Sequence, residues 1–238
     1  MKEATRCAGV PAIAPPSATT LALKRAVDVL GSAVGLLILS PLLLAIAVVI
    51  KLDSPGGAIF RQERIGRGGR PFRIFKFRTM VAGAPRHGTE TITVRADSRV
   101  TRVGAFIRKY KLDELPQFIN VLRGDMSLVG PRPEVPEFMN LYSPEQRGTI
   151  TSMRPGMTDY AAIVLRDESS LYDGQVDPAE IYRCEIVPIK FSYYERYSQD
   201  IGFLNDLRII VATVSVLAFN RVPEIFGLEH KLRLTKPR

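Results

Sequence analysis

The adjacent carboxylates Asp113 and Glu114 are the residues of this chain best suited to chemistry. They open the segment 111–124, in which apolar residues recur with the spacing of one helix face and Gly124 is the expected C-terminal stop. Because Pro116 is tolerated only in the first turn of a helix, it places Asp113 at or near the N-cap and Glu114 in the first turn. Backbone N–H groups and the helix dipole at that end favour an ionised carboxylate, the form that a nucleophile or a metal ligand needs. The alternative is an ordinary helix cap without chemistry.

Basic side chains on both sides of this pair could hold phosphate. Arg132 lies between two prolines, after Gly130, in a stiff turn that fixes its guanidinium for bidentate contacts. Two strand-like stretches are predicted, 58–62 and 72–77, and Lys76 and Arg78 lie in or directly after the second, where aromatic and basic residues alternate. Each signal alone is weak, because a rigid loop or a solvated basic face would look the same.

The element that must position this chemistry is an apolar run of 22 residues, Val29–Ile50. Its length suffices to cross a bilayer, but Lys24 and Arg25 precede it and further basic residues follow it, whereas a spanning helix should leave fewer cations outside. The pair Ser40-Pro41 in the middle predicts a break, because proline lacks an N–H and clashes with the preceding turn. We therefore expect a helix-break-helix hairpin that re-enters on the same face. A single kinked span is the alternative.

Charged residues at the start of this run predict how the helix enters the interface. Asp28 follows Arg25 by three residues and Lys24 by four, so it can pair with either on one helix face and fix the entry depth. In the remaining chain, Val103 to Tyr110 has the spacing of a basic amphipathic helix, which either lies in the membrane interface or packs as an ordinary surface helix. Asp97 or Ser98 is its expected cap.

Composition limits the partners. The net charge of +9 indicates an anionic partner, whether acidic lipid, a phosphate substrate or nucleic acid. Cys7 and Cys184 have no metal or disulfide spacing, which favours a reducing compartment. We predict four segments: a flexible tail (1–20), the re-entrant helix (21–52), one globular domain (53–220), for which the resemblance described below implies a cytoplasmic, catalytic role, and a basic tail (221–238). The apolar stretch Leu204–Phe219 is expected to be a packing or interfacial helix.

Several motifs in a fixed order resemble those of the bacterial sugar transferase family, the monotopic polyprenyl-phosphate phosphoglycosyl transferases, in their short form with only the catalytic domain. The resemblance covers roughly residues 21–220. The motifs are Lys24-Arg25-x-x-Asp28, Ser40-Pro41, Phe75-Lys76-Phe77-Arg78-Thr79-Met80, Leu112-Asp113-Glu114-Leu115-Pro116-Gln117, Asn120-Val121-Leu122-Arg123-Gly124-Asp125-Met126-Ser127, Val129-Gly130-Pro131-Arg132-Pro133 and Arg154-Pro155-Gly156.

The resemblance implies a helix-rich α+β domain resting on the cytoplasmic face of the bacterial inner membrane. It implies transfer of a sugar-1-phosphate from a nucleotide diphosphate sugar, expected to be a UDP-sugar, to polyprenyl (undecaprenyl) phosphate, as the first step of a surface glycan. Asp113 would be the nucleophile and form a covalent phosphosugar, Glu114 would hold Mg²⁺, and Lys76, Arg78 and Arg132 would contact phosphate. The expected partners include inner-membrane lipids but no nucleic acid. The oligomeric state is left open, and a homodimer is one of the alternatives.

The chain departs from the resemblance at one point. Many family members continue Arg-Pro-Gly with Ile-Thr-Gly-Trp-Ala-Gln, whereas this chain has Met157-Thr158-Asp159-Tyr160-Ala161-Ala162. Because the catalytic motifs are intact, the expected reaction is unchanged by this departure, whereas the sugar that is transferred stays undefined. Two rivals explain less: a tethered, non-catalytic basic protein does not account for Asp113-Glu114 near Pro-Arg-Pro, and a catalytically dead assembly partner is disfavoured because that pair is intact.

Overall fold

The structure, a computed structural model, describes residues 16–84, 97–166, 168 and 177–219. In chain order its elements are α1 Ala18–Asp53, β1 Ile59–Ile65, η1 Arg67–Gly69, β2 Pro71–Phe77, α2 Arg102–Lys109, η3 Leu112–Gln117, α3 Phe118–Arg123, β3 Ser127–Val129, α4 Pro136–Met139, α5 Pro144–Ser152, β4 Gly156–Thr158, α6 Tyr160–Val164, α7 Pro178–Ile181, η5 Tyr182–Ile186, α8 Val187–Gln199 and α9 Phe203–Phe219. The predicted helix-rich α+β class is confirmed. The expected C-terminal tail 221–238 lies outside the described residues, as does most of the expected N-terminal tail 1–20. Helix α1 begins at Ala18, before the N-terminal tail was expected to end.

Two small sheets form the β part. β1 and β2 make an antiparallel hairpin, with Ile59 opposite Phe77 and Ile65 opposite Pro71, so the two strand-like stretches of the sequence are confirmed. β3 and β4 pair in parallel, with Val129 opposite Thr158. The chain at this second pair approaches so closely that a Cβ on Gly156 would collide with the backbone of Gly130, and a Cβ on Gly130 with the carbonyl of Arg154. The chain therefore brings the Pro-Arg-Pro turn directly against the Arg-Pro-Gly turn.

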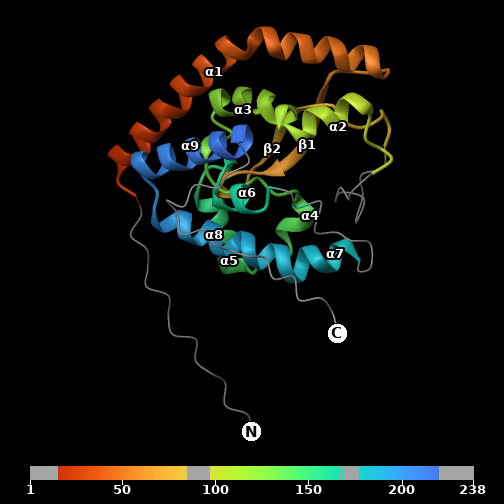
Figure 1. Ribbon diagram of the computed structural model, residues 1–238. Helices are drawn as coiled ribbons and strands as arrows, with labels where there is room; N and C mark the ends of the chain where they lie inside the picture. Colours follow the sequence, from red (N-terminus) through yellow and green to blue (C-terminus); the bar gives the residue numbers. More distant parts are fainter. Residues whose placement is uncertain (1–15, 85–96, 167, 169–176, 220–238) are drawn as a thin grey trace.

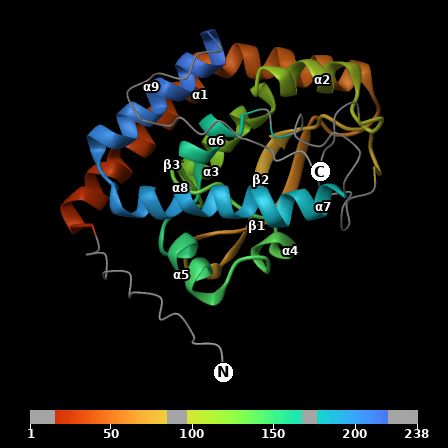
Figure 2. The ribbon, with the colours of Figure 1, turned by 60° about the horizontal axis from the view of Figure 1, so that its bottom comes forward.

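The main core lies between the second sheet and the C-terminal helices. Buried tyrosines dominate it, among them Tyr160, Tyr194 and Tyr197, together with Ile186 and Ile209. α7, η5 and α8 follow one another as a single rod across the domain (Figure 2), and α1 arches over the opposite side above α3, α2 and α9 (Figure 1). The site elements η3 and α3 are thus held between this core and α1.

α1 is one helix of 36 residues, so the expected interruption at Ser40-Pro41 is not present. Pro41 leaves the carbonyl of Leu37 without its usual donor, and the hydroxyl of Ser40 donates to that carbonyl at 2.9 Å, which lets the helix continue. Figure 1 shows that the helix bends over the domain. It is long and apolar enough to cross a bilayer.

Apolar side chains remain exposed on α1, α2 and α9, the helices on the α1 side of the domain. On α1, Leu37, Leu44 and Leu52 are examples, and on α9 Leu204 and Val214 are. Because Asp206 and the buried residues of α9 face the domain, this helix both packs and presents an apolar face, as the sequence indicated.

α2 is amphipathic as predicted. Val103 and Ile107 pack beneath α1, whereas the rings of Phe106 and Tyr110 are exposed and contact each other at 5.0 Å between centroids. The expected cap was wrong, because Thr101 accepts the N–H of Gly104 and caps the helix. An exposed aromatic pair beside an exposed apolar helix is the composition of a membrane-facing surface.

Candidate active site

Asp113 and Glu114 lie in the short 3-10 helix η3, between β2 and α3. Asn120 of α3 fixes this geometry, because its side chain accepts the N–H of Phe75 at 2.9 Å and donates to the carbonyl of Arg73 at 2.8 Å. α3 ends at Gly124, whose φ of 88° is the left-handed conformation of a helix stop, as the sequence predicted. The carboxylate pair is thereby attached to the same strand that carries Lys76.

Glu114 is the charge centre of the site. Arg132 donates to both of its oxygens, at 3.1 Å from Nη1 to Oε2 and by a short contact from Nη2 to Oε1, and Lys76 donates to Oε1 at 2.9 Å. Although burial opposes ionisation, the two cations hold the pKa of Glu114 well below its usual value. Glu114 is therefore ionised, and it connects β2 to the Pro-Arg-Pro turn.

Asp113 has a different environment. Its residue is 8% exposed, and its Oδ1 atom is buried without a hydrogen-bond partner among the described residues. Asp113 lies near the N-cap and Glu114 in the first turn, as predicted, but the cap position itself is Lys111, in a left-handed conformation with φ of 56°, and Asp113 makes no capping bond. Burial, followed by the charge of Glu114, raises the pKa of Asp113, against the lowering effect of Lys76. This carboxylate is poorly solvated, which makes it more reactive once ionised.

The cations predicted to contact phosphate divide into two groups. Lys76 and Arg132 lie at Glu114, and both keep donors that Glu114 does not use, because an ammonium has three and a guanidinium five. Burial lowers the pKa of Lys76 to about 8. Arg78 lies elsewhere: its guanidinium donates to the carbonyls of Ser54 at 2.7 Å, Ile50 at 3.3 Å and Pro55. The structure thus gives Arg78 the role of closing the C-terminal end of α1, and its contact with phosphate stays a prediction.

The three charged residues near the start of α1 attach that helix to the domain, and they do so without the predicted pairing within the helix. Lys24 donates to Asp206 of α9 at 2.6 Å and to the carbonyl of Val129 at 2.8 Å. Arg25 donates to the carbonyls at the C-terminal end of α3, where a cation is favourable.

Asp28 is buried in this attachment. It accepts hydrogen bonds from the hydroxyl of Ser127 at 3.0 Å and the N–H of Leu128 at 2.9 Å, in place of the predicted bond to Lys24 or Arg25. The N-terminal part of α1 is therefore connected to β3, α3 and α9.

The residues present can serve a magnesium ion only in a limited way. No group of three or more acidic, histidine or cysteine side chains gathers in the described part of the chain. An ionised carboxylate offers about four lone-pair positions, and three donors already occupy Glu114. Glu114 can therefore give a cation about one bond through Oε2, and Asp113 a second through its free oxygen. This fits Mg²⁺, which often takes one or two carboxylates and completes its shell with waters and substrate phosphates.

Sequence reasoning missed the function of Asp159. Its two oxygens accept the N–H of Arg132 at 2.9 Å and the N–H of Ala162 at 2.6 Å. Burial raises the pKa of Asp159 to about 6, against the lowering effect of these two bonds and of the charges on Arg132 and Lys190. Tyr194 of α8 also faces it. The signal in the sequence was the departure at residues 157–162, which revealed the substitution but not its partner.

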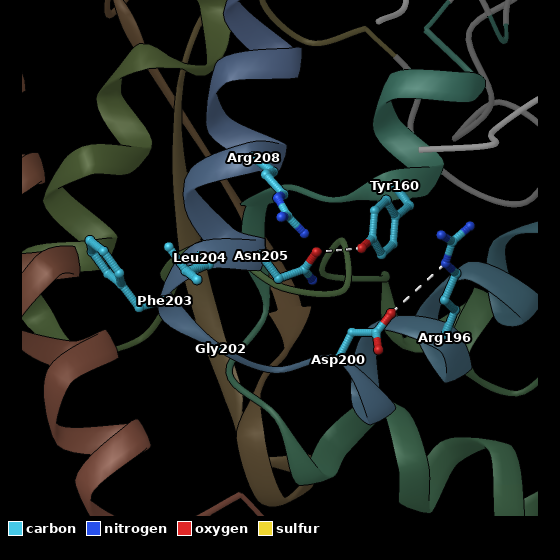
Figure 3. Close-up of a pocket in the computed structure, with 8 residues that line it drawn as sticks. All are labelled: Tyr160, Arg196, Asp200, Gly202, Phe203, Leu204, Asn205 and Arg208. Carbon is cyan, nitrogen blue, oxygen red and sulfur yellow. Dashed lines mark hydrogen bonds and ion pairs between the residues drawn. The ribbon is translucent and has the colours of Figure 1, made fainter. Parts of the chain in front are cut away.

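A separate hollow of about 490 Å³ lies where α6, α8 and α9 meet. In Figure 3 the phenol of Tyr160 points to Asn205, to which it donates at 2.7 Å, and Nε of Arg196 lies 3.9 Å from a carboxylate oxygen of Asp200. Arg208 also lines the hollow, whereas Asp113 and Glu114 do not. The carboxylate pair is thus not part of this hollow.

The chain is similar in sequence to several bacterial proteins. The chain is 46% identical to a UDP-N-acetylgalactosamine-undecaprenyl-phosphate N-acetylgalactosaminephosphotransferase of Aeromonas hydrophila, over 63% of this chain and 36% of that protein. It is 42% identical to a UDP-glucose:undecaprenyl-phosphate glucose-1-phosphate transferase of Caulobacter vibrioides, over 82% and 69%. It is 32% identical to the exopolysaccharide production protein ExoY of Rhizobium meliloti, over 93% and 99%. Residues 19–220 match the family described as bacterial sugar transferase, and the chain belongs to that family.

Proposed function

We propose that this protein transfers a sugar-1-phosphate from a UDP-sugar to undecaprenyl phosphate, through a covalent intermediate on Asp113. The observation that carries the proposal is the contrast within the carboxylate pair: Glu114 already accepts three hydrogen bonds from Lys76 and Arg132, whereas Asp113 is buried with a free oxygen beside them. Glu114 organises the cations, and Asp113 is left for attack. The substrates are proposed from those named for the similar proteins of Aeromonas and Caulobacter.

The first half-reaction forms a bond from an Asp113 oxygen to the phosphorus that bears the sugar. The bond from that phosphorus to the bridging oxygen breaks, and the electron pair leaves with the nucleoside monophosphate. Lys76 and Arg132 use their remaining donors to stabilise the negative charge that develops on the phosphate oxygens. Magnesium, when bound at Glu114, supplies further positive charge against the diphosphate.

In the second half-reaction an oxygen of the lipid phosphate attacks the same phosphorus. The bond from phosphorus to Asp113 breaks, so the carboxylate is regenerated and the sugar is left on a polyprenyl diphosphate. Asp113 must be ionised at the start of each cycle. Burial raises its pKa, and the charges of Lys76, Arg108 and Lys111 act in the opposite direction.

We propose that the protein is monotopic and that both ends of α1 lie at the cytoplasmic face of the inner membrane. Support comes from the attachment of α1 at its two ends to one folded unit: Lys24 and Asp28 bind the domain near the start, and Arg78 binds the carbonyls of Ile50 and Ser54 near the end. A helix that crossed a bilayer core of roughly 30 Å would place its ends on opposite sides. Exposed apolar residues of α1, α2 and α9 would then enter the lipid.

The proposal is tested with purified protein, undecaprenyl phosphate and a panel of UDP-sugars, by measuring release of uridine monophosphate. We expect release with one sugar class, dependent on the lipid for multiple turnovers, and none from Asp113→Asn, whose shape is nearly unchanged. Folded protein that releases no nucleotide with any sugar of the panel, or an Asp113→Asn variant with full turnover, would contradict the proposal.

A further inference from the structure

The Pro-Arg-Pro turn has a single main-chain donor. Prolines have no N–H, so among residues 131–133 only Arg132 can donate a main-chain hydrogen bond. That N–H points to Asp159, which accepts it at 2.9 Å. The position of Arg132 therefore depends on a carboxylate from a different part of the chain.

Two other contacts hold the same turn through its carbonyls. Pro131 accepts the N–H of Gly156 at 2.9 Å, and Pro133 accepts a donor from Arg64 at 2.9 Å. These contacts fix the ends of the turn, whereas the bond to Asp159 fixes its centre. Removal of that bond would leave the guanidinium attached to a main chain that can rotate.

The pairing of β3 with β4 holds Asp159 close to the Pro-Arg-Pro turn. β3 and β4 are paired up to Val129 and Thr158, and the N–H of Gly130 donates to Thr158 at 3.0 Å. Asp159 follows Thr158 directly and is 1% exposed. A buried carboxylate is costly unless it is hydrogen-bonded, and here each oxygen accepts one backbone N–H.

We propose that Asp159 is a positioning residue for the sugar-phosphate transfer, acting through Arg132. Its Oδ2 atom holds the main chain of Arg132 so that the guanidinium reaches Glu114 and the substrate phosphates together. Its Oδ1 atom caps α6 at Ala162, so one side chain couples the helix start to the phosphate-binding turn. This inference rests on the proposed function.

The test separates the two bonds of Asp159. Asp159→Ser keeps one oxygen, enough for the helix cap, and gives up the bond to Arg132. The matched control is Asp177→Ser, at an aspartate that caps α7 by accepting the N–H of Ala179 at 3.0 Å. Loss of one hydrogen bond that places a charged group should lower kcat/KM for the nucleotide sugar about tenfold in Asp159→Ser, equivalent to about 1.4 kcal/mol. The control should stay within about twofold of wild type.

Two readouts distinguish positioning from a merely structural role. In an Arg132→Ala background, Asp159→Ser should have no further effect on kcat/KM, because the group it places is gone. In protein labelled with ¹⁵N-arginine, the amide of Arg132, identified by its loss in Arg132→Lys, should exchange with solvent at least tenfold faster in Asp159→Ser than in wild type or in Asp177→Ser.

The outcomes are separable from those of the proposed function. An unchanged exchange rate in Asp159→Ser, wild-type kcat/KM in that variant, or an equal loss in the Arg132→Ala background would overturn the inference. A wild-type protein that lacks transferase activity would instead contradict the proposed function, and the exchange measurement would still decide whether Asp159 holds Arg132.

Discussion

Replacement of Glu114 by glutamine should destabilise the protein markedly, although the two side chains have nearly the same shape. The carboxylate accepts three charge-assisted bonds, two from Arg132 and one from Lys76. Glutamine keeps one acceptor oxygen and turns an NH₂ group toward a donor, so at least one bond is lost and two partly buried cations lose their counter-charge. Breaking a buried pair costs about 3–5 kcal/mol, and we take the lower end because the side chain of Arg132 is 32% exposed.

That cost corresponds to a measurable shift in thermal unfolding. For a protein of this size about 1 kcal/mol moves Tm by roughly 2–4 °C, so a cost of about 3 kcal/mol predicts a fall of about 6–12 °C in the Glu114→Gln variant. The assay is thermal unfolding of detergent-purified protein at one protein concentration and pH 7.

A double-mutant cycle provides the control. Lys76→Met removes one of the two cations, so it should destabilise Glu114→Gln much less than it destabilises wild type, with a coupling of about 1–3 kcal/mol. A Tm for Glu114→Gln within about 1 °C of wild type, or equal effects of Lys76→Met in both backgrounds, would refute the description of Glu114 as the charge centre.

Three further predictions concern topology, metal and pH. Cysteine labels on either side of α1 should both be protected from an impermeant maleimide in intact cells. Replacement of Ser40-Pro41 by Ala-Ala should straighten the helix and expose the N-terminal label; an unchanged pattern would show that the bend is set elsewhere. Excess EDTA should abolish turnover and added Mg²⁺ should restore it, whereas undiminished turnover in EDTA would exclude the metal. Because the folded-state pKa of Asp159 is about 6 and the unfolded value 3.8, its ionisation favours the unfolded state, and its contribution to stability falls by about 3 kcal/mol as pH rises from about 3.8 to 6. The Asp159→Asn variant should lack this pH dependence of stability. Its Tm difference from wild type should therefore change between pH 4 and pH 7, and an equal difference at both pH values would contradict the prediction.

Local signals in the sequence predicted much of the fold. The two strands β1 and β2, the amphipathic α2 and the stop of α3 at Gly124 each follow from short-range rules of periodicity and backbone conformation. The continuity of α1 did not follow, because a single side-chain bond from Ser40 to Leu37 offsets the donor that Pro41 lacks.

The partners of charged residues could not be predicted in the same way. Arg78 looked like a phosphate ligand by composition, yet it binds carbonyls about two dozen residues earlier in the chain. Asp28 was expected to pair with Lys24 or Arg25, but its Oδ1 atom accepts a hydrogen bond from Ser127, some hundred residues later in the chain. Asp113 was expected at or near the helix cap, and only the structure shows that Lys111 is the cap position and that Asp113 follows it in the first turn. Such contacts depend on the tertiary fold, which sequence spacing does not encode.

The most direct test of the central claim is the mass of the intact protein after incubation with the UDP-sugar that it turns over, in the absence of lipid acceptor. The account predicts one added phosphosugar per active protein, located on Asp113, together with a burst of one equivalent of uridine monophosphate, and loss of the adduct when undecaprenyl phosphate is added. An active protein that shows no adduct and no burst under these conditions, or an adduct on a different residue, would contradict the assignment of Asp113 as the nucleophile.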